Sequence, residues 1–200
     1  WRLGFVVLGV ASFAWVVVWY LYFRDDPKDH PAITPEELAV LPEPRKVGAK
    51  QNIPWGRLTM RILPVTLTYF CYGWTLWLFL GWLPSFFKLN YGLDLKNSAL
   101  FASGVFFAGV VGDTLGGVFS DRILKKTGNL KLARLSVIVV GFLGAAASLT
   151  GVFFTKDLTL VALLLSSGFF FAELVIGPIW SVPMDIAPTY SGTAAGLMNT

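Results

Sequence analysis

Five apolar runs, each long enough to cross a bilayer as a helix, constrain this chain more than any other feature. A hydrocarbon core of about 30 Å needs about 20 helical residues. The first two runs contain no charged residue, and the other three contain one each, namely Asp113, Arg134 and Glu173. The runs cover residues 3–23, 62–87, 98–120, 132–154 and 158–183, and a sixth begins at Ser191. We therefore predict an all-α, polytopic membrane helix bundle.

Charge and rare residues exclude several classes of function. The net charge is +4, but the basic residues lie in loops between apolar runs and not on one face, so we expect no nucleic-acid partner. Cys71 and His30 are the single cysteine and the single histidine, which leaves no cluster of either type for a metal. We expect no metal and no cofactor. Because no nucleophile–base pair is apparent among the polar residues, we do not expect an enzyme.

Basic residues are distributed unequally between the loops, and this sets the expected orientation. Segments 24–61 and 121–134 together carry twelve Lys and Arg residues, whereas the loops on the opposite side carry three. Both basic segments are therefore predicted to be cytoplasmic. The expected domains are one helix (1–23), a charged linker (24–61) and a helix bundle (62–200). Within the linker, Thr34 followed by Pro35 and two acids predicts a short helix.

The third apolar run has a small residue at every fourth position. These residues are Gly104, Ala108, Gly112, Gly116 and Ser120. Small side chains allow helix backbones to approach closely in lipid. We predict a close helix contact along this face. A smooth face would also allow helices to slide between two conformations, and this alternative stays open.

A loop motif follows this run, with the sequence Gly116-Gly117-Val118-Phe119-Ser120-Asp121-Arg122 and then Lys125 and Lys126. It resembles the loop signature of the major facilitator superfamily, in which glycines and an acid precede several bases. Segments 24–31, 69–74, 81–84 and 184–199 are similar to the anion:cation symporter branch, which includes permeases for hexuronates and glucarate. The resemblance runs from the family's sixth helix to the start of its eleventh. It implies a fragment centred on the carboxyl-terminal bundle, without the first five helices.

This resemblance implies a secondary active transporter in a bacterial inner membrane. It would import an organic anion, such as a sugar acid, by proton-coupled alternating access. An exporter, a Na⁺-coupled porter and a transport-dead membrane sensor remain alternatives. The implied partners are the anion, protons, the lipid bilayer and the amino-terminal half of the transporter. That half must supply a cation for the substrate, because the apolar runs carry no Lys or Arg at mid-depth.

Several polar residues within the runs are candidates for function. Glu173 lies about 22 Å from the outer end of its run by helix rise, near the midplane, so it should be paired, hydrated or protonated. It is a candidate for proton or substrate handling, with a structural acid as the alternative. Tyr69 and Tyr72 are too deep to be interface anchors. They are predicted to bind substrate hydroxyls, and the resemblance adds Asn199 to this set.

A second group of candidates belongs to the loop motif. The acid followed by bases in a tight turn suggests a gate that opens and closes with the access state. Asp113 lies about 12 Å from the inner boundary, so a gating or packing pair with a base of another helix is expected in preference to coupling. The predicted gating group is Gly117, Asp121, Arg122, Lys125, Lys126 and Asp113.

Overall fold

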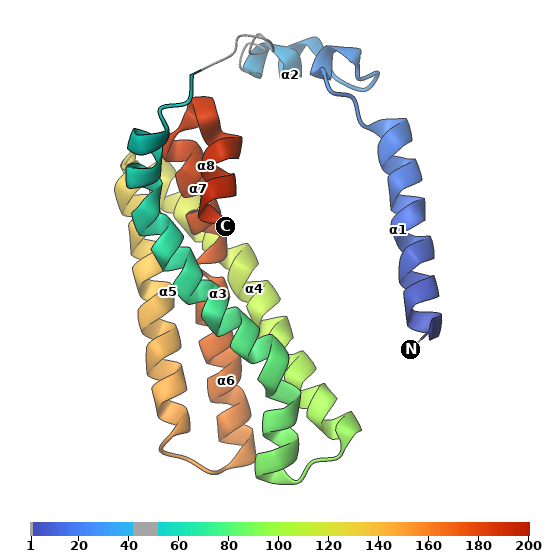
Figure 1. The fold of residues 1–200 in the computed structure, drawn as a ribbon, viewed down its shortest axis with the longest axis vertical. Helices are drawn as coiled ribbons and strands as arrows, with labels where there is room; N and C mark the ends of the chain where they lie inside the picture. Colours follow the sequence, from blue (N-terminus) through green and yellow to red (C-terminus); the bar gives the residue numbers. More distant parts are fainter. Residues whose placement is uncertain (1, 42–51) are drawn as a thin grey trace. The chain divides into compact units, whose positions relative to one another are not determined.

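A computed structural model describes residues 2–41 and 52–200 of this chain. Within these ranges the chain is built from helices, with no strand (Figure 1). It divides into two compact units, Trp1–Gln51 and Asn52–Thr200. The fold class expected from the sequence is confirmed.

The first unit contains one long apolar helix and a short helix. Helix α1 (Arg2–Tyr22) has no buried residue and is long and apolar enough to cross a membrane. After a 3₁₀ turn, η1 (Pro27–Asp29), comes α2 (Pro35–Val40). Its first turn is a capping box: Glu37 N–H donates to Thr34 Oγ1 (3.2 Å), and Thr34 N–H donates to Glu37 Oε2 (2.9 Å). The bond from the Thr34 backbone, followed by that from its hydroxyl, lowers the pKa of Glu37. The predicted short helix is confirmed.

The second unit is a bundle whose long helices begin and end at local signals. They are α3 (Trp55–Tyr91), α4 (Leu95–Thr127), α5 (Leu130–Val152), α6 (Leu158–Glu173) and α7 (Ile176–Ile186), followed by η2 (Pro188–Tyr190) and α8 (Ser191–Met198). The side chains of Asp94, Asn129 and Asp157 cap the starts of α4, α5 and α6. Gly92 and Gly128 end α3 and α4 with φ of 64° and 65°, which favours glycine.

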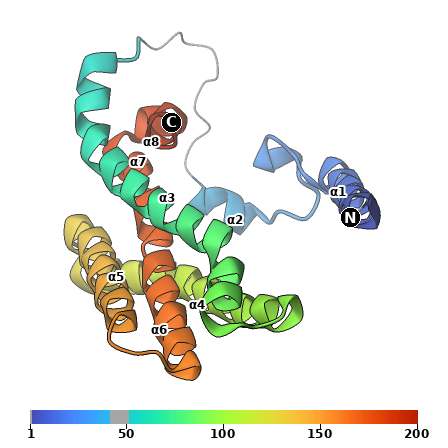
Figure 2. The same cartoon turned by 60° about the horizontal axis from the view of Figure 1, so that its bottom comes forward.

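All five expected spans are present as helices, and some extend further than expected. Helix α3 begins at Trp55, seven residues before the predicted apolar run, because the turns carrying Arg57 and Arg61 are also helical. Helix α6 packs against both α4 and α5, as Figures 1 and 2 show. A hydrophobic core around Phe87, Val105 and Phe169 fills the space between α3, α4 and α6.

The fifth expected run, 158–183, is not one continuous helix. Helix α6 ends at Glu173, and α7 begins at Ile176. Pro178 lacks the N–H that would bond the carbonyl of Leu174 four residues earlier, which explains the interruption. The membrane-crossing segment therefore runs Leu158–Ile186 in two pieces, and Glu173 occupies the end of the first piece.

The four-residue spacing of small residues in α4 predicts the helix contact only in part. Gly112 and Gly116 lie against α6 and its continuation so closely that a Cβ on either would overlap the carbonyl oxygen of Phe170 or Leu174. Gly104, by contrast, faces open space. A four-residue step rotates about 40° beyond one helical turn, so a stripe of such steps cannot remain on one face. Gly109 lies on the contact face in its place.

This difference gives a stability prediction with a control on the same helix. Gly112→Ala should destabilise the protein by about 1–3 kcal/mol, since the new methyl meets backbone that cannot rotate away. Gly104→Ala should leave stability unchanged or raise it by up to about 1 kcal/mol, because its Cβ meets open space and Ala is a better helix former than Gly. Unfolding of both variants in the same detergent measures the difference. Equal stability of the two would contradict the close α4–α6 contact.

Candidate functional site

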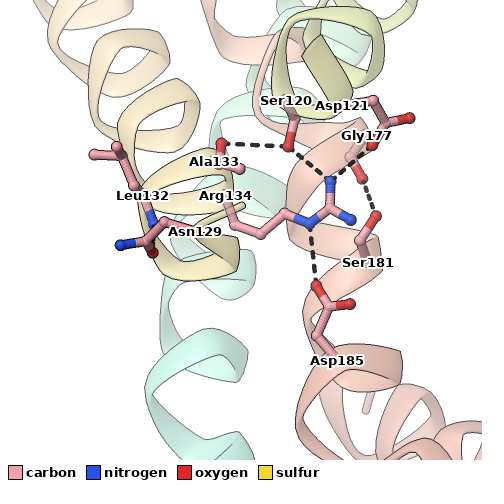
Figure 3. Close-up of polar contacts among 9 residues, drawn as sticks. All are labelled: Ser120, Asp121, Asn129, Leu132, Ala133, Arg134, Gly177, Ser181 and Asp185. Carbon is pink, nitrogen blue, oxygen red and sulfur yellow. Dashed lines mark hydrogen bonds and ion pairs between the residues drawn. The ribbon is translucent and has the colours of Figure 1, made fainter. Parts of the chain in front are cut away.

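One polar group joins α4, α5 and α7 near the loop motif, and we call it the Arg134 cluster (Figure 3). It consists of Ser120, Asp121, Arg134 and Asp185. The Arg134 guanidinium donates from Nη1 to Asp121 Oδ1 (3.0 Å) and to Ser120 Oγ (2.7 Å). Its Nε donates to Asp185 Oδ2 (3.0 Å). One guanidinium thus ties together three helices through charge-assisted hydrogen bonds.

The two acids of the Arg134 cluster are not equivalent. The Arg134 side chain is 14% exposed, Asp185 is 23% exposed and Asp121 is 63% exposed. Ser120 is buried and also donates to the Ala133 carbonyl (3.2 Å), which fixes the orientation of its hydroxyl. Because water competes most strongly for Asp121, the Arg134–Asp121 contact is the easier of the two to break.

The other predicted gating residues lie outside this cluster. Arg122, Lys125 and Lys126 are exposed and form no ion pair within residues 2–41 and 52–200. Asp113 is also exposed, and no base of another helix pairs with it in these ranges. Gly117 lies at a close crossing, where a Cβ on Gly177 would come within 2.7 Å of its nitrogen.

Sequence reasoning assigned no role to Arg134 or Asp185. The signal was present, since Arg134 is the single charge of its apolar run and Asp185 lies two residues after the fifth run. Without knowledge of its partner, a charged residue at the edge of a span is interpreted only as an indicator of membrane orientation. That partner lies 51 residues away in the chain.

A second polar group lies deeper in the bundle, and we call it the Glu173 cluster. It consists of Tyr69 and Tyr72 of α3, Glu173 of α6 and Trp180 of α7. The Tyr72 hydroxyl donates to Glu173 Oε1 (2.8 Å). The ring of Tyr69 stacks on Tyr72 (5.8 Å between centroids) and meets Trp180 edge-on (5.5 Å). A membrane-embedded carboxylate is thereby paired with a phenol.

The predicted substrate-binding residues are placed differently from one another. Tyr72 is only 3% exposed, and its hydroxyl is occupied by Glu173. Tyr69 is half-buried, and its hydroxyl has no hydrogen bond to any described residue. Asn199 is exposed at the end of α8, and within the described ranges no hydrogen bond or ring contact joins it to the Glu173 cluster. The fold therefore brings Tyr69, Tyr72 and Glu173 together.

One interrupted span carries an acid of each cluster. Glu173 ends α6 and Asp185 lies in the last turn of α7, so the two are at most about 18 Å apart by helix rise. This span therefore carries one acid hydrogen-bonded to a tyrosine and one acid paired with Arg134. The described residues contain no group of three or more His, Cys, Asp or Glu side chains that could hold a metal ion.

Comparison with known proteins agrees with this membrane bundle. The family model described as "Major Facilitator Superfamily" matches residues 1–200. The chain belongs to the Major Facilitator Superfamily. It is a multi-pass membrane protein, and the resemblance stated from the loop motif is confirmed.

Relatives in this superfamily are transporters and not enzymes, and those named here are of the anion:cation symporter type. A probable sulfoacetate transporter of Cupriavidus necator is 47% identical over all of this chain and 47% of its own length. A probable galactarate/D-glucarate transporter of Escherichia coli is 31% identical over all of this chain and 48% of its own length. A hexuronate transporter of Bacillus subtilis is 25% identical over all of this chain and 47% of its own length. The chain spans about half the length of these relatives.

Proposed function

We propose that this chain is part of a secondary active transporter that imports a small organic anion by proton-coupled alternating access. The observation that carries the proposal is Glu173, a carboxylate hydrogen-bonded inside a bundle of membrane-crossing helices. Superfamily membership and the names of the relatives support it. The proposed location is a bacterial inner membrane, with segments 24–61 and 121–134 in the cytoplasm.

The proposed substrate class is a carboxylate-bearing anion, with a sugar acid as first candidate. Two of the named relatives are described as transporters of galactarate/D-glucarate and of hexuronate. Sulfoacetate, a small dianion without hydroxyls, is the second candidate. It is favoured by the 47% identical relative and by the engagement of the Tyr72 hydroxyl, which leaves fewer groups to bind substrate hydroxyls.

The substrate's charge must be neutralised by another part of the transporter. Arg134 is the one base within the apolar runs, and two carboxylates already compensate it. Tyr69, Trp180 and Asn199 can offer hydrogen bonds and ring surfaces but no positive charge. We therefore propose that the remaining half of the transporter holds the carboxylate, while this half contacts the rest of the substrate.

The proposed gate is the Arg134 cluster together with the loop motif. In one access state Asp121 accepts from Arg134, and in the other this contact is broken. The strongly exposed Asp121 would release first, whereas Asp185 keeps Arg134 in place. Gly117 allows the close crossing with Gly177, and Arg122, Lys125 and Lys126 act as exposed charges of the same turn.

Counterflow in proteoliposomes tests the proposed function. The purified full-length transporter is loaded with unlabelled glucarate, glucuronate or sulfoacetate, and entry of each labelled anion is measured. Exchange of at least one anion is expected, and an imposed inward proton gradient should drive net uptake. Binding without exchange would indicate a sensor. Uptake driven by a Na⁺ gradient and not by a proton gradient would replace the proposed coupling ion.

A substrate comparison tests the hydroxyl-binding residues. Tyr69→Phe and Asn199→Ala should each weaken the apparent affinity for glucarate about 5- to 100-fold, because a hydroxyl of the substrate loses its partner. The affinity for sulfoacetate, which has no hydroxyl, should change less than about twofold. Apparent KM values for both substrates measure this. Equal losses for the two would indicate that these residues serve packing.

A further inference from the structure

Tyr72 is hydrogen-bonded to Glu173 and almost fully buried. Its hydroxyl donates to Glu173 Oε1 at 2.8 Å, and its side chain is 3% exposed. The stacked ring of Tyr69 covers it on one side. We propose that Tyr72 is a positioning residue for Glu173 and not a ligand of the substrate. This inference rests on the proposed role of Glu173 in transport.

Glu173 is held from two helices at once. Helix α3 supplies the Tyr72 hydroxyl, and α4 supplies the surface under the stem of the side chain. A Cβ on Gly109 would come within 3.0 Å of Glu173 Cγ, so the methylene groups of Glu173 lie directly against this glycine. Asp113 of α4 adds a like charge that repels the carboxylate. The Glu173 carboxylate thus bonds to Tyr72 while its stem packs against Gly109.

A substrate hydroxyl would compete poorly for Tyr72. While Glu173 is deprotonated, the bond from the phenol to its carboxylate is charge-assisted and about twice as strong as one between neutral groups. Breaking it to bind a neutral hydroxyl would leave Glu173 without its donor inside the membrane. Any effect of Tyr72 on transport must then pass through Glu173, and it must be the same for every substrate.

Tyr72 and Tyr69 provide a matched pair for the experiment. The two rings are stacked, and each Tyr→Phe change removes one hydroxyl. Among the described residues, only the Tyr72 hydroxyl of these two has a hydrogen bond to Glu173. Net uptake and counterflow are measured for the full-length transporter with glucarate and sulfoacetate. Each variant is made both in the wild-type protein and in Glu173→Gln. Phe keeps the ring packing, and thermal denaturation in detergent verifies that every variant is folded.

The expected result separates the two tyrosines. Tyr72→Phe should lower the ratio of net uptake to exchange about 2- to 12-fold for whichever substrates are transported, the range expected for one net hydrogen bond. In Glu173→Gln the same change should have less than a twofold effect, because the carboxylate it positions is gone. Tyr69→Phe should leave the ratio unchanged and weaken only glucarate.

Two results would overturn the inference. One is a Tyr72→Phe variant that loses affinity for glucarate alone, as a substrate ligand would. The other is an equal fall of the ratio in the wild-type and Glu173→Gln proteins, which would mean that Tyr72 does not act through Glu173.

A failure of the proposed coupling role of Glu173 can be distinguished from a failure of this inference. In that case Glu173→Gln itself would have the same ratio of net uptake to exchange as the wild type. The positioning role is then decided by infrared spectroscopy of the carboxyl group, with the Glu173 band identified by its loss in Glu173→Gln. Tyr72→Phe should shift this band and Tyr69→Phe should not. An unshifted band would overturn the inference even in a protein that does not transport.

Discussion

Asp121→Asn is expected to slow net uptake by the full-length transporter about three- to tenfold while leaving the protein folded. Asn keeps the shape of Asp and can still accept from Arg134, but the charge that strengthens this contact is lost. An alternating-access equilibrium balanced to within a few kcal/mol shifts tenfold for each 1.4 kcal/mol removed from one state. The uptake rate in proteoliposomes and the denaturation temperature in detergent measure the two parts of this prediction.

The same loop offers controls that separate the contact from the general charge of the turn. Arg122→Gln and Lys125→Gln each remove an exposed base that has no ion pair among the described residues. Both should slow uptake clearly less than Asp121→Asn does, since an exposed charge without an ion pair contributes little. Wild-type uptake in Asp121→Asn, or an equal loss in all three variants, would disprove a gate based on the Arg134–Asp121 contact.

Asp185→Asn should differ from Asp121→Asn in its effect on stability. Asp185 is 23% exposed against 63% for Asp121, so removing its charge leaves a largely buried guanidinium with less compensation. The variant should therefore unfold at a lower temperature than Asp121→Asn. Comparing the unfolding temperatures of the two variants tests which of the two acids holds Arg134 in place.

Glu173→Gln is expected to lower proton-driven net uptake more than tenfold and to reduce exchange less than about threefold. Gln is fixed in the neutral form, so the protein can no longer take up and release a proton at this position. Exchange of one anion for another needs no net proton movement, which is why it should survive. The dependence of net uptake on external pH should also become flatter, and parallel uptake and counterflow assays over a pH series measure both effects.

Asp113→Asn is the matched control for this prediction. Asp113 is also an acid within a membrane-crossing helix, but it is exposed and accepts no hydrogen bond from the Glu173 cluster. Its replacement removes a like charge that acts on Glu173, so the pH dependence of net uptake should shift, but the ratio of net uptake to exchange should fall much less than in Glu173→Gln. An unchanged pH profile in Glu173→Gln would instead assign Glu173 a structural role, as the hydrogen-bond partner that keeps Tyr72 satisfied.

Local information was sufficient for the five membrane-crossing spans and their approximate limits, but not for the break of the fifth span into α6 and α7. Each apolar run is long enough to cross a bilayer, and in that environment a helix satisfies all backbone hydrogen bonds within the run. The helix starts at Asp94, Asn129 and Asp157 depend on a side chain bonding to a backbone group three residues away. The loop motif from Gly116 to Lys126 is also contiguous, and so the sequence alone identified the superfamily.

The partners of the functional side chains were decided only by the tertiary structure. Arg134 and Asp185 are 51 residues apart, and Tyr72 and Glu173 are 101 residues apart. Periodicity shows which residues share one helical face, but not which neighbouring helix that face meets. For the same reason the spacing of small residues in α4 favoured Gly104, whereas the crossing with α6 selected Gly109, Gly112 and Gly116. Helix crossings depend on packing all spans together, and so no segment read by itself specifies them.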